Sequence, residues 1–222
     1  ETVEPAGENR REWTLRLQDG ASESFDAVIL ALPAYRAARL VRPFDTDLAR
    51  SLEEIEYAST AIVVSGHRLQ DVEHPLDAFG LVVPAVEGRE ILAVSFASRK
   101  FSGRAPEGRV ILRTFIGGAM QPELMRNSDD ALLEIARREL CEIFGVRGSE
   151  DFAVVARYDN AMPQYHVGHL DRVAKIEGLT AEHAGLALAG NAYHGVGIPD
   201  CIHSGERAAE AILIGEKSGA RR

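Results

Sequence analysis

The sequence lacks any hydrophobic run near the ~18 residues that a membrane-spanning helix needs, and it lacks a block of basic residues. Its 34 acidic residues outnumber its 25 basic ones, and the resulting net charge of -9 argues against nucleic acid as a partner. Its two cysteines, Cys141 and Cys201, have no CxxC spacing and follow no secretory leader. We therefore expect structural thiols in a reducing, cytoplasmic setting.

Several catalytic signatures are also missing. The chain contains no GxGxxG, no GxxxxGK[ST], no HExxH and no GxSxG pattern, which removes the usual signals of a dinucleotide fingerprint, a phosphate loop, a zinc protease and a hydrolase elbow. His166 and His169 are three apart without a carboxylate cluster, so we predict solvent or capping roles for them. His194 and His203 have no nucleophile beside them, because Ser204 falls inside a predicted helix. No metal site is predicted.

At the amino end, the residues indicate a hairpin. "WTLRL" (13–17) alternates apolar and polar residues, Asp19-Gly20 supplies a turn, and "DAVILALP" (26–33) is predicted as the returning strand. Its apolar character is typical of a strand covered on both faces. A short helix is predicted to follow from Thr46 as N-cap, with Leu48, Leu52 and Ile55 along one face.

The middle of the chain is rich in strand patterns. "STAIVVSGHR", "AFGLVVP", "EILAVSFAS" and "RVILRTFIGG" follow one another with short Pro- and Gly-containing links, which predicts an antiparallel sheet. A helix is predicted from Ser128 as N-cap to Gly145, and "DFAVVARYD" is predicted as a further strand. The apolar face of that helix holds Leu133, Ala136, Leu140 and Phe144. The fold class is therefore α/β and α+β, with an antiparallel middle between two parts of one domain.

Near the carboxyl end, "LALAGNAYHGVGIPDCIHSGERAAEAIL" (186–213) joins a strand, a glycine-rich turn and a helix. Gly190, Gly195 and Gly197 tolerate positive φ and expose bare backbone, and Pro199 suits a first helical turn. The N–H groups of such a helix end favour a planar, electron-rich ligand. The alternative is that the glycines serve only tight packing.

Period-2 alternation on the strand "RVILRTFIGG" places Arg113 and Phe115 on one face, with Leu112 and Thr114 on the other. A guanidinium beside an aromatic ring could hold a flat substrate that bears carboxylates. The alternative is a buried Phe115 and a surface Arg113 that strand twist makes neighbours.

Taken together, "DAVILALPAY", "FGLVVP", "VSFASRKFSGRAPEG", "RTFIGG", "NAMPQYHVGHLDRV" and "LAGNAYHGVGIPDCIHSGERAA" resemble the C-terminal half of the protoporphyrinogen and coproporphyrinogen oxidases, flavoenzymes of the amine oxidase superfamily. The resemblance implies the C-terminal part of a Rossmann-like FAD domain, residues 1–34 and 166–222, with an antiparallel substrate domain, 35–165, inserted in it. The family's dinucleotide fingerprint would precede Glu1, which is not a methionine, so we expect a piece of a longer chain.

FAD is the cofactor that this resemblance implies. Its ring would lie against the glycine turn, with backbone N–H groups of Val196, Gly197 and Ile198 at N1 and O2, the backbone of Val3 at the adenine, and Ala31 near the adenosine. The substrate pocket carries over to Phe79, Val82, Ser95 and Phe115. The family often has a larger apolar residue where this chain has Ser95. A role for Arg113 as a propionate partner is our own hypothesis.

The implied reaction of heme biosynthesis oxidises a porphyrinogen to the porphyrin, with oxygen as acceptor and without a protein nucleophile. The sequence does not decide between protoporphyrinogen and coproporphyrinogen. The resemblance further implies the N-terminal half as a partner, with a homodimer and peripheral membrane contact in the complete enzyme, and an incomplete FAD site without turnover in this chain alone. Two alternatives stay open: another amine-oxidase-like flavoprotein, and a noncatalytic α/β module that binds a ligand or a protein.

Overall fold

The structure, a computed structural model, describes residues 2–6 and 12–219. The chain divides into two compact units: residues 1–56 with 163–222 form the first, and residues 57–162 form the second. Residues 35–56, assigned to the middle portion on sequence, belong to the first unit. The reason is their packing, because helix α2 (Thr46–Glu53) contacts α5 (His169–Ala181), and α1 (Ala34–Val41) contacts α2.

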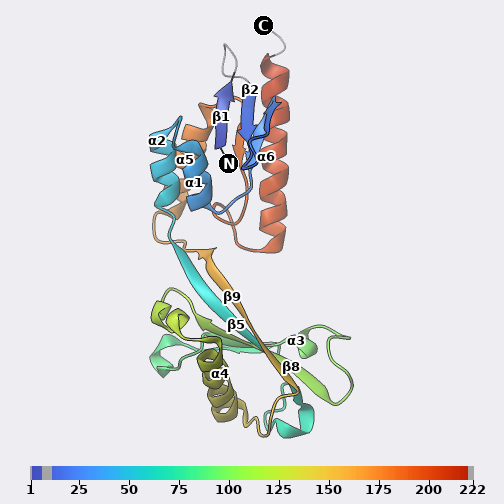
Figure 1. The fold of residues 1–222 in the computed structure, drawn as a ribbon. Helices are drawn as coiled ribbons and strands as arrows, with labels where there is room; N and C mark the ends of the chain where they lie inside the picture. Colours follow the sequence, from blue (N-terminus) through green and yellow to red (C-terminus); the bar gives the residue numbers. More distant parts are fainter. Residues whose placement is uncertain (1, 7–11, 220–222) are drawn as a thin grey trace. The chain divides into compact units, whose positions relative to one another are not determined.

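Two small sheets form the strand layer of the first unit. β1 (Thr2–Ala6), β2 (Glu12–Arg16) and β3 (Ser22–Phe25) make an antiparallel sheet in that order. β4 (Val28–Leu30) pairs in parallel with β10 (Leu186–Leu188). Helix α6 (Ile198–Gly219) lies on one side of these strands, and α1, α2 and α5 lie on the other (Figure 1).

The predicted hairpin exists, but its returning strand was wrong. The turn is present, since Gly20 has φ 86° and Ala21 N–H donates to Asp19 Oδ1 at 2.9 Å. The strand that returns is the polar β3, which continues the ladder directly after the turn. The apolar run 26–33 instead contributes β4 to the parallel pair, where Leu30 is buried.

The first helices also differ from expectation by small, explicable amounts. The N-cap of α2 is Asp45, one residue before the predicted Thr46, because the Asp45 carboxylate accepts hydrogen bonds from Asp47 N–H (3.0 Å) and Leu48 N–H (2.8 Å). Helix α1 was not predicted. Its buried residues nevertheless have helical spacing: Ala34, Ala37, Ala38 and Val41.

A five-stranded sheet in the order β6-β7-β8-β5-β9 forms the second unit. These strands are β5 (Tyr57–Arg68), β6 (Gly80–Val82), β7 (Ala93–Phe96), β8 (Arg109–Gly117) and β9 (Phe152–Pro163). The predicted antiparallel pairing is confirmed for β6 with β7, β7 with β8 and β5 with β8. Short segments complete the unit: α3 (Ala97–Lys100) and the 3-10 turns Leu69–Asp71, Ala85–Glu87 and Pro122–Arg126.

Helix α4 (Asp129–Phe144) covers one face of this sheet and closes its core. Both predicted ends are confirmed, because Ser128 Oγ accepts from Ala131 N–H at 3.3 Å and Gly145 adopts φ 60°. Leu140 and Phe144 pack against strand residues such as Phe96 and Leu112. Among the helices that the structure describes, none is both long and apolar enough to cross a membrane.

Under α4, His67 is a buried titratable residue of the second unit. Its side chain is 5% exposed, and its Nε2 is hydrogen-bonded to Ser65 Oγ at 2.8 Å. Burial lowers the pKa of His67 below 6.5, against the raising effect of the nearby carboxylates Glu150, Asp151 and Asp71.

We expect this unit to lose stability as the pH falls from above 6.5 toward the lower pKa of folded His67. The sign follows from proton uptake, because the unfolded chain binds the proton first. The measurement is urea unfolding at pH 7.5 and 5.5 for the wild type and for His67→Gln. The variant should show a smaller loss between these two pH values, and an unchanged loss would assign the effect to another group.

Candidate functional site

The carboxyl ends of two parallel strands meet at one edge of the first unit. Leu30 is opposite Leu188, and Ala189 N–H donates to Leu30 O at 3.2 Å. Ala31 and Gly190, which follow these strands, therefore lie at the same edge. Ligands of open α/β sheets bind outside the carboxyl ends of the strands. A Cβ placed on Gly190 would meet no atom within 4 Å, so the space beside this backbone is open.

The turn from Gly190 to Gly197 is held in shape by side chains. Gly190 N–H donates to Ser204 Oγ at 3.0 Å. The Tyr165 hydroxyl donates to Asn191 O at 2.6 Å, and His169 Nε2 donates to Tyr193 O at 2.9 Å. The predicted solvent or capping role of His169 is therefore wrong, because its ring is 5% exposed and bonds to the turn.

Only one of the three predicted glycines has the expected backbone. Gly190 has φ 127°, whereas Gly195 and Gly197 lie outside the positive region. A Cβ on Gly195 would lie 2.7 Å from Asp200 Cβ, and one on Gly197 would lie 2.9 Å from Asp200 Oδ2. These two glycines leave room for the Asp200 side chain. We predicted an open approach for a flat ligand at all three positions, and only Gly190 has open space beside it.

The Asp200 side chain also caps the N-terminal end of its own helix, α6. Its Oδ2 accepts from Gly197 N–H at 3.2 Å, as the third helical residue does in a capping box. Pro199 has no N–H to offer. Among the described residues, the N–H groups of Val196 and Ile198 have no acceptor, and both side chains are exposed. Two of the three predicted donors thus remain available to a ligand.

The predicted adenine contact, Val3, lies in β1 opposite Leu15. Its side chain is 4% exposed and belongs to the core, so only its backbone could meet a ligand. β1 is one of the two edge strands of its sheet in the described part of the chain, which leaves the backbone groups on its outer edge unpaired by another strand.

In the second unit, the sheet face opposite α4 gathers four of the five predicted substrate residues. Ser95 is opposite Arg113, Ala93 is opposite both Phe115 and Val82, and directly paired residues share a face. We call this surface the open face, defined by Val82, Ser95, Arg113 and Phe115. The predicted alternation is observed, because Leu112 and Thr114 are fully buried on the α4 side.

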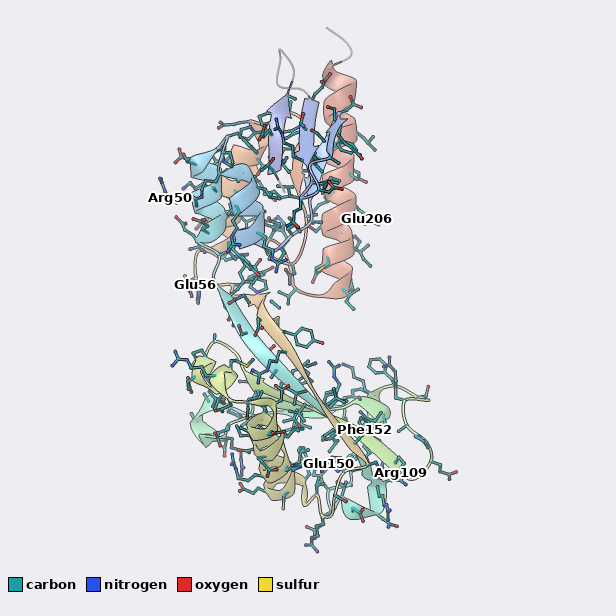
Figure 2. All side chains as sticks on the ribbon, in the orientation of Figure 1. Arg50, Glu56, Arg109, Glu150, Phe152 and Glu206 are labelled. Carbon is teal, nitrogen blue, oxygen red and sulfur yellow. The ribbon has the colours of Figure 1, made fainter. Side chains whose placement is uncertain are left out.

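The open face combines apolar Val82 and Phe115 with polar Ser95 and cationic Arg113. Val82 is 76% exposed. The Phe152 ring of β9, labelled in Figure 2, occupies the space beside Gly66 of β5 on the same sheet. The Arg113 guanidinium carbon lies 5.5 Å from the centroid of the Phe115 ring, which is within cation–π range. Among the described residues no carboxylate pairs with Arg113, whereas Arg109 on the same strand pairs with Asp151.

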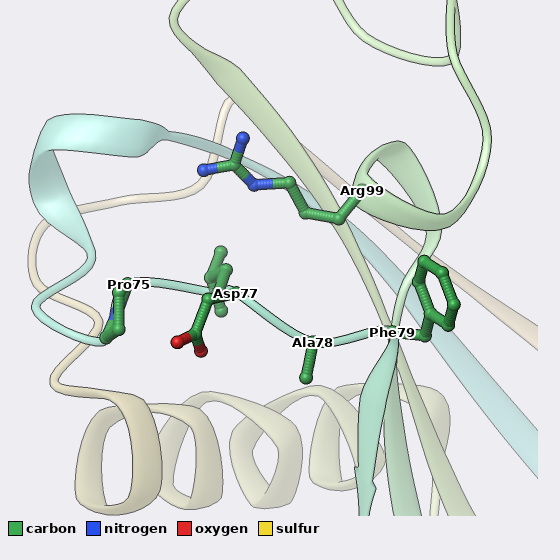
Figure 3. A pocket seen from close by; sticks show the side chains of 6 residues that line it. Pro75, Asp77, Ala78, Phe79 and Arg99 are labelled. Atoms are coloured by element: carbon green, nitrogen blue, oxygen red, sulfur yellow. The ribbon is translucent and has the colours of Figure 1, made fainter.

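Phe79, the fifth predicted substrate residue, lies elsewhere. It precedes β6 and is three positions from Val82, so strand alternation does not bring it to the open face. It lines a hollow of about 430 Å³ with Leu76, Asp77 and Arg99. Figure 3 shows Arg99 reaching from α3 across the segment that holds Pro75 and Asp77.

Other chemistries find little support in the described residues. No group of three or more His, Cys, Asp and Glu side chains there is arranged to hold a metal ion. Cys141 and Cys201 are free thiols. His194 is engaged with Glu177 at 2.6 Å and His203 with Glu206 at 2.9 Å, so neither activates a nucleophile.

Sequence reasoning missed the residues that shape the turn, namely Tyr165, His169 and Ser204. The signal for the first two was present, since both lie in the "PQYHVGH" segment on which the resemblance rests. Spacing alone could not assign them, because their partners Asn191 and Tyr193 are more than twenty positions away along the chain.

Known proteins resemble this chain along nearly its whole length. Coproporphyrinogen III oxidase of Propionibacterium freudenreichii subsp. freudenreichii is 36% identical over 94% of the chain, and chloroplastic protoporphyrinogen oxidase of Nicotiana tabacum is 30% identical over 84%. A solved structure from Exiguobacterium sp. 255-15, described as "Putative protoporphyrinogen oxidase", superposes with a TM-score of 0.80 at 27% identity and covers 100% of the chain.

These comparisons confirm a mixed α/β fold with antiparallel sheets and support the resemblance seen in the sequence. The chain spans 40% and 36% of the two enzymes and 46% of the solved chain, which is less than half of each. The family model described as flavin containing amine oxidoreductase matches residues 3–213. The chain therefore belongs to the flavin containing amine oxidoreductase family.

Proposed function

We propose that this chain is the C-terminal part of an FAD-dependent porphyrinogen oxidase. One observation carries the proposal: a fixed glycine turn joins the carboxyl edge of two parallel strands to the start of α6, in a chain matched by the flavin family over residues 3–213. In this proposal the first unit is the C-terminal portion of a Rossmann-like FAD domain. The second unit is a substrate domain inserted in it.

The residues present fit part of an FAD site. Gly190 has open space beside its backbone, Ala31 is exposed at the same edge, and the N–H groups of Val196 and Ile198 are available as donors. The positive end of the α6 dipole would stabilise negative charge on the flavin ring. Asp200 opposes this effect with its own charge at the same helix end. Val3 would offer its backbone to the adenine.

FAD would supply the hydride acceptor, with oxygen as the final electron acceptor. The residues of this chain would bind and orient, and none of them needs to act as a nucleophile. Val82 and Phe115 would form the apolar part of a wall for a flat macrocycle, with Ser95 on the same face and Phe79 in the neighbouring hollow. A wall of this kind would hold the ring of the macrocycle and keep water away from it.

The test of this function uses the full-length protein that carries this chain. We expect a yellow protein with one bound flavin, whose absorbance near 450 nm disappears when a porphyrinogen is added without oxygen. A colourless protein that takes up no FAD would contradict the proposal and favour a noncatalytic binding module. A yellow protein that ignores porphyrinogens would indicate a different member of the flavoprotein family.

Arg113 provides a sharper test of the substrate. We propose that its guanidinium pairs with a propionate carboxylate, because it lies on the open face without a carboxylate partner in the described structure. Arg113→Ala should weaken porphyrinogen binding by about 10- to 150-fold, since a hydrogen bond to a charged group contributes roughly 1.5–3 kcal/mol. The matched control is Arg109→Ala on the same strand, where Asp151 already occupies the guanidinium. Equal affinities of the wild type and Arg113→Ala would remove the idea.

For the complete protein, the same resemblance leads us to propose a cytoplasmic homodimer in peripheral contact with a membrane. Sedimentation would give the oligomeric state, and flotation with phospholipid vesicles would test the membrane contact. Comparison of kcat/KM for the two porphyrinogens would decide between protoporphyrinogen and coproporphyrinogen.

A further inference from the structure

The "PQYHVGH" segment (163–169) forms a tight turn ahead of α5. Gln164 N–H donates to Glu56 O at 2.9 Å, and His169 N–H donates to His166 O at 3.0 Å. Gly168 adopts φ 85°, which favours glycine. The turn brings Tyr165 and His169 together, and their rings stack with centroids 3.8 Å apart at an interplanar angle of 13°.

Within this stacked pair, Tyr165 ties the two ends of the glycine turn to each other. Its hydroxyl donates to Asn191 O at 2.6 Å, and the Gly195 backbone bonds to the same hydroxyl. Burial raises the pKa of Tyr165 above 10.0, so the hydroxyl keeps its proton and its donor role at neutral pH.

His169 holds the middle of the same turn. Its Nε2 donates to Tyr193 O, and the ring is 5% exposed. Its Nδ1 is buried and has no hydrogen-bond partner among the described residues. Buried polar atoms without partners are exceptional. The bond from Nε2 to Tyr193 O and the stack on Tyr165 position the His169 ring.

These two bonds set the orientation of two peptide groups. The chain has no cis peptide in its described part, and in a trans peptide the C=O and N–H point in opposite directions. The carbonyls of Asn191 and Tyr193 are directed at the stacked pair. The N–H groups of the same two peptides, which belong to Ala192 and His194, therefore point away from the pair. Loss of either bond would let that peptide group rotate. Its negative carbonyl oxygen could then point to the side of the turn that the N–H now faces.

We infer that Tyr165 and His169 are positioning residues, which orient the glycine turn so that its positive backbone groups stabilise reduced flavin relative to oxidised flavin. The inference rests on the proposed function. It assigns a role to a segment that the proposed chemistry leaves without one.

The experiment is a redox titration of the bound flavin in the full-length protein, followed by absorbance, for Tyr165→Phe, His169→Phe and His169→Gln. Both phenylalanine variants keep an aromatic ring in the stack and lose the donor, whereas glutamine restores an N–H. The matched control is His166→Phe, three residues away, because His166 is solvent-exposed and pairs with Glu56 at 3.1 Å.

We expect Tyr165→Phe and His169→Phe to lose about tenfold in affinity for reduced flavin relative to oxidised flavin, a fall of roughly 30 mV for a two-electron couple. His169→Gln should recover most of this loss, and His166→Phe should match the wild type. Equal potentials in all variants that bind FAD would overturn the inference and leave the proposed function intact. A wild-type protein that binds no FAD would overturn both.

Discussion

Replacing Trp13 by alanine is expected to lower the free energy of unfolding of the first unit by about 3–5 kcal/mol. Trp13 is the single tryptophan of the chain, and its side chain is fully buried. Its ring meets Phe44 edge to face at 5.4 Å, and its Nε1 donates to Ala184 O at 3.0 Å. The residue therefore joins β2 to the link between α5 and β10.

Two variants separate packing from hydrogen bonding at this position. Trp13→Phe keeps an aromatic ring but leaves Ala184 O without its donor, so we expect a loss of about 1–3 kcal/mol. Leu17→Ala, just beyond the end of β2, serves as the control, because Leu17 is 43% exposed and should change stability by less than about 0.5 kcal/mol. Urea unfolding followed by far-UV circular dichroism gives all three values. Similar losses for Trp13→Ala and Leu17→Ala would show that the ring does not hold these segments together.

The packing of Trp13 also explains which parts of the fold the sequence could reveal. Local patterns predicted α4, its Ser128 N-cap and the antiparallel strands of the second unit, because each depends on residues that are near one another in the chain. The returning strand of the first hairpin was mispredicted for the opposite reason. The run 26–33 pairs with β10, more than 150 residues away, and no local pattern records that partner.

In the candidate site too, local patterns predicted some features and missed those that depend on residues elsewhere in the chain. Alternation correctly placed Arg113 and Phe115 together on one face, since a strand fixes side-chain direction every second residue. Phe79 was grouped with Val82 from resemblance, although an odd separation along a strand puts two residues on opposite faces. The use of space near Gly195 could not be predicted, because it depends on how closely the start of α6 brings Asp200 to this backbone.

Gly195→Ala is the second change for which we expect a large effect. The added Cβ would lie 2.7 Å from Asp200 Cβ, an atom that no side-chain rotation can move. The backbone at the start of α6 must therefore shift, and the Gly197 N–H bond to Asp200 would be lost with it. We expect a cost of about 1–3 kcal/mol in the stability of the first unit. FAD uptake by the full-length protein should fall at least tenfold, because the turn carries the remaining ligand donors.

A double variant identifies the cause of this effect. Asp200→Gly removes the obstructing Cβ, so Gly195→Ala should cost much less stability in that background than in the wild type, and the difference is the coupling energy of the pair. The control is Gly178→Ala in α5, where a Cβ would meet nothing within 4 Å and should stabilise the helix by about 0.5–1 kcal/mol. Equal costs of Gly195→Ala in both backgrounds would mean that the glycine is needed for its own backbone conformation. The Asp200 side chain would then have no part in setting the shape of the turn.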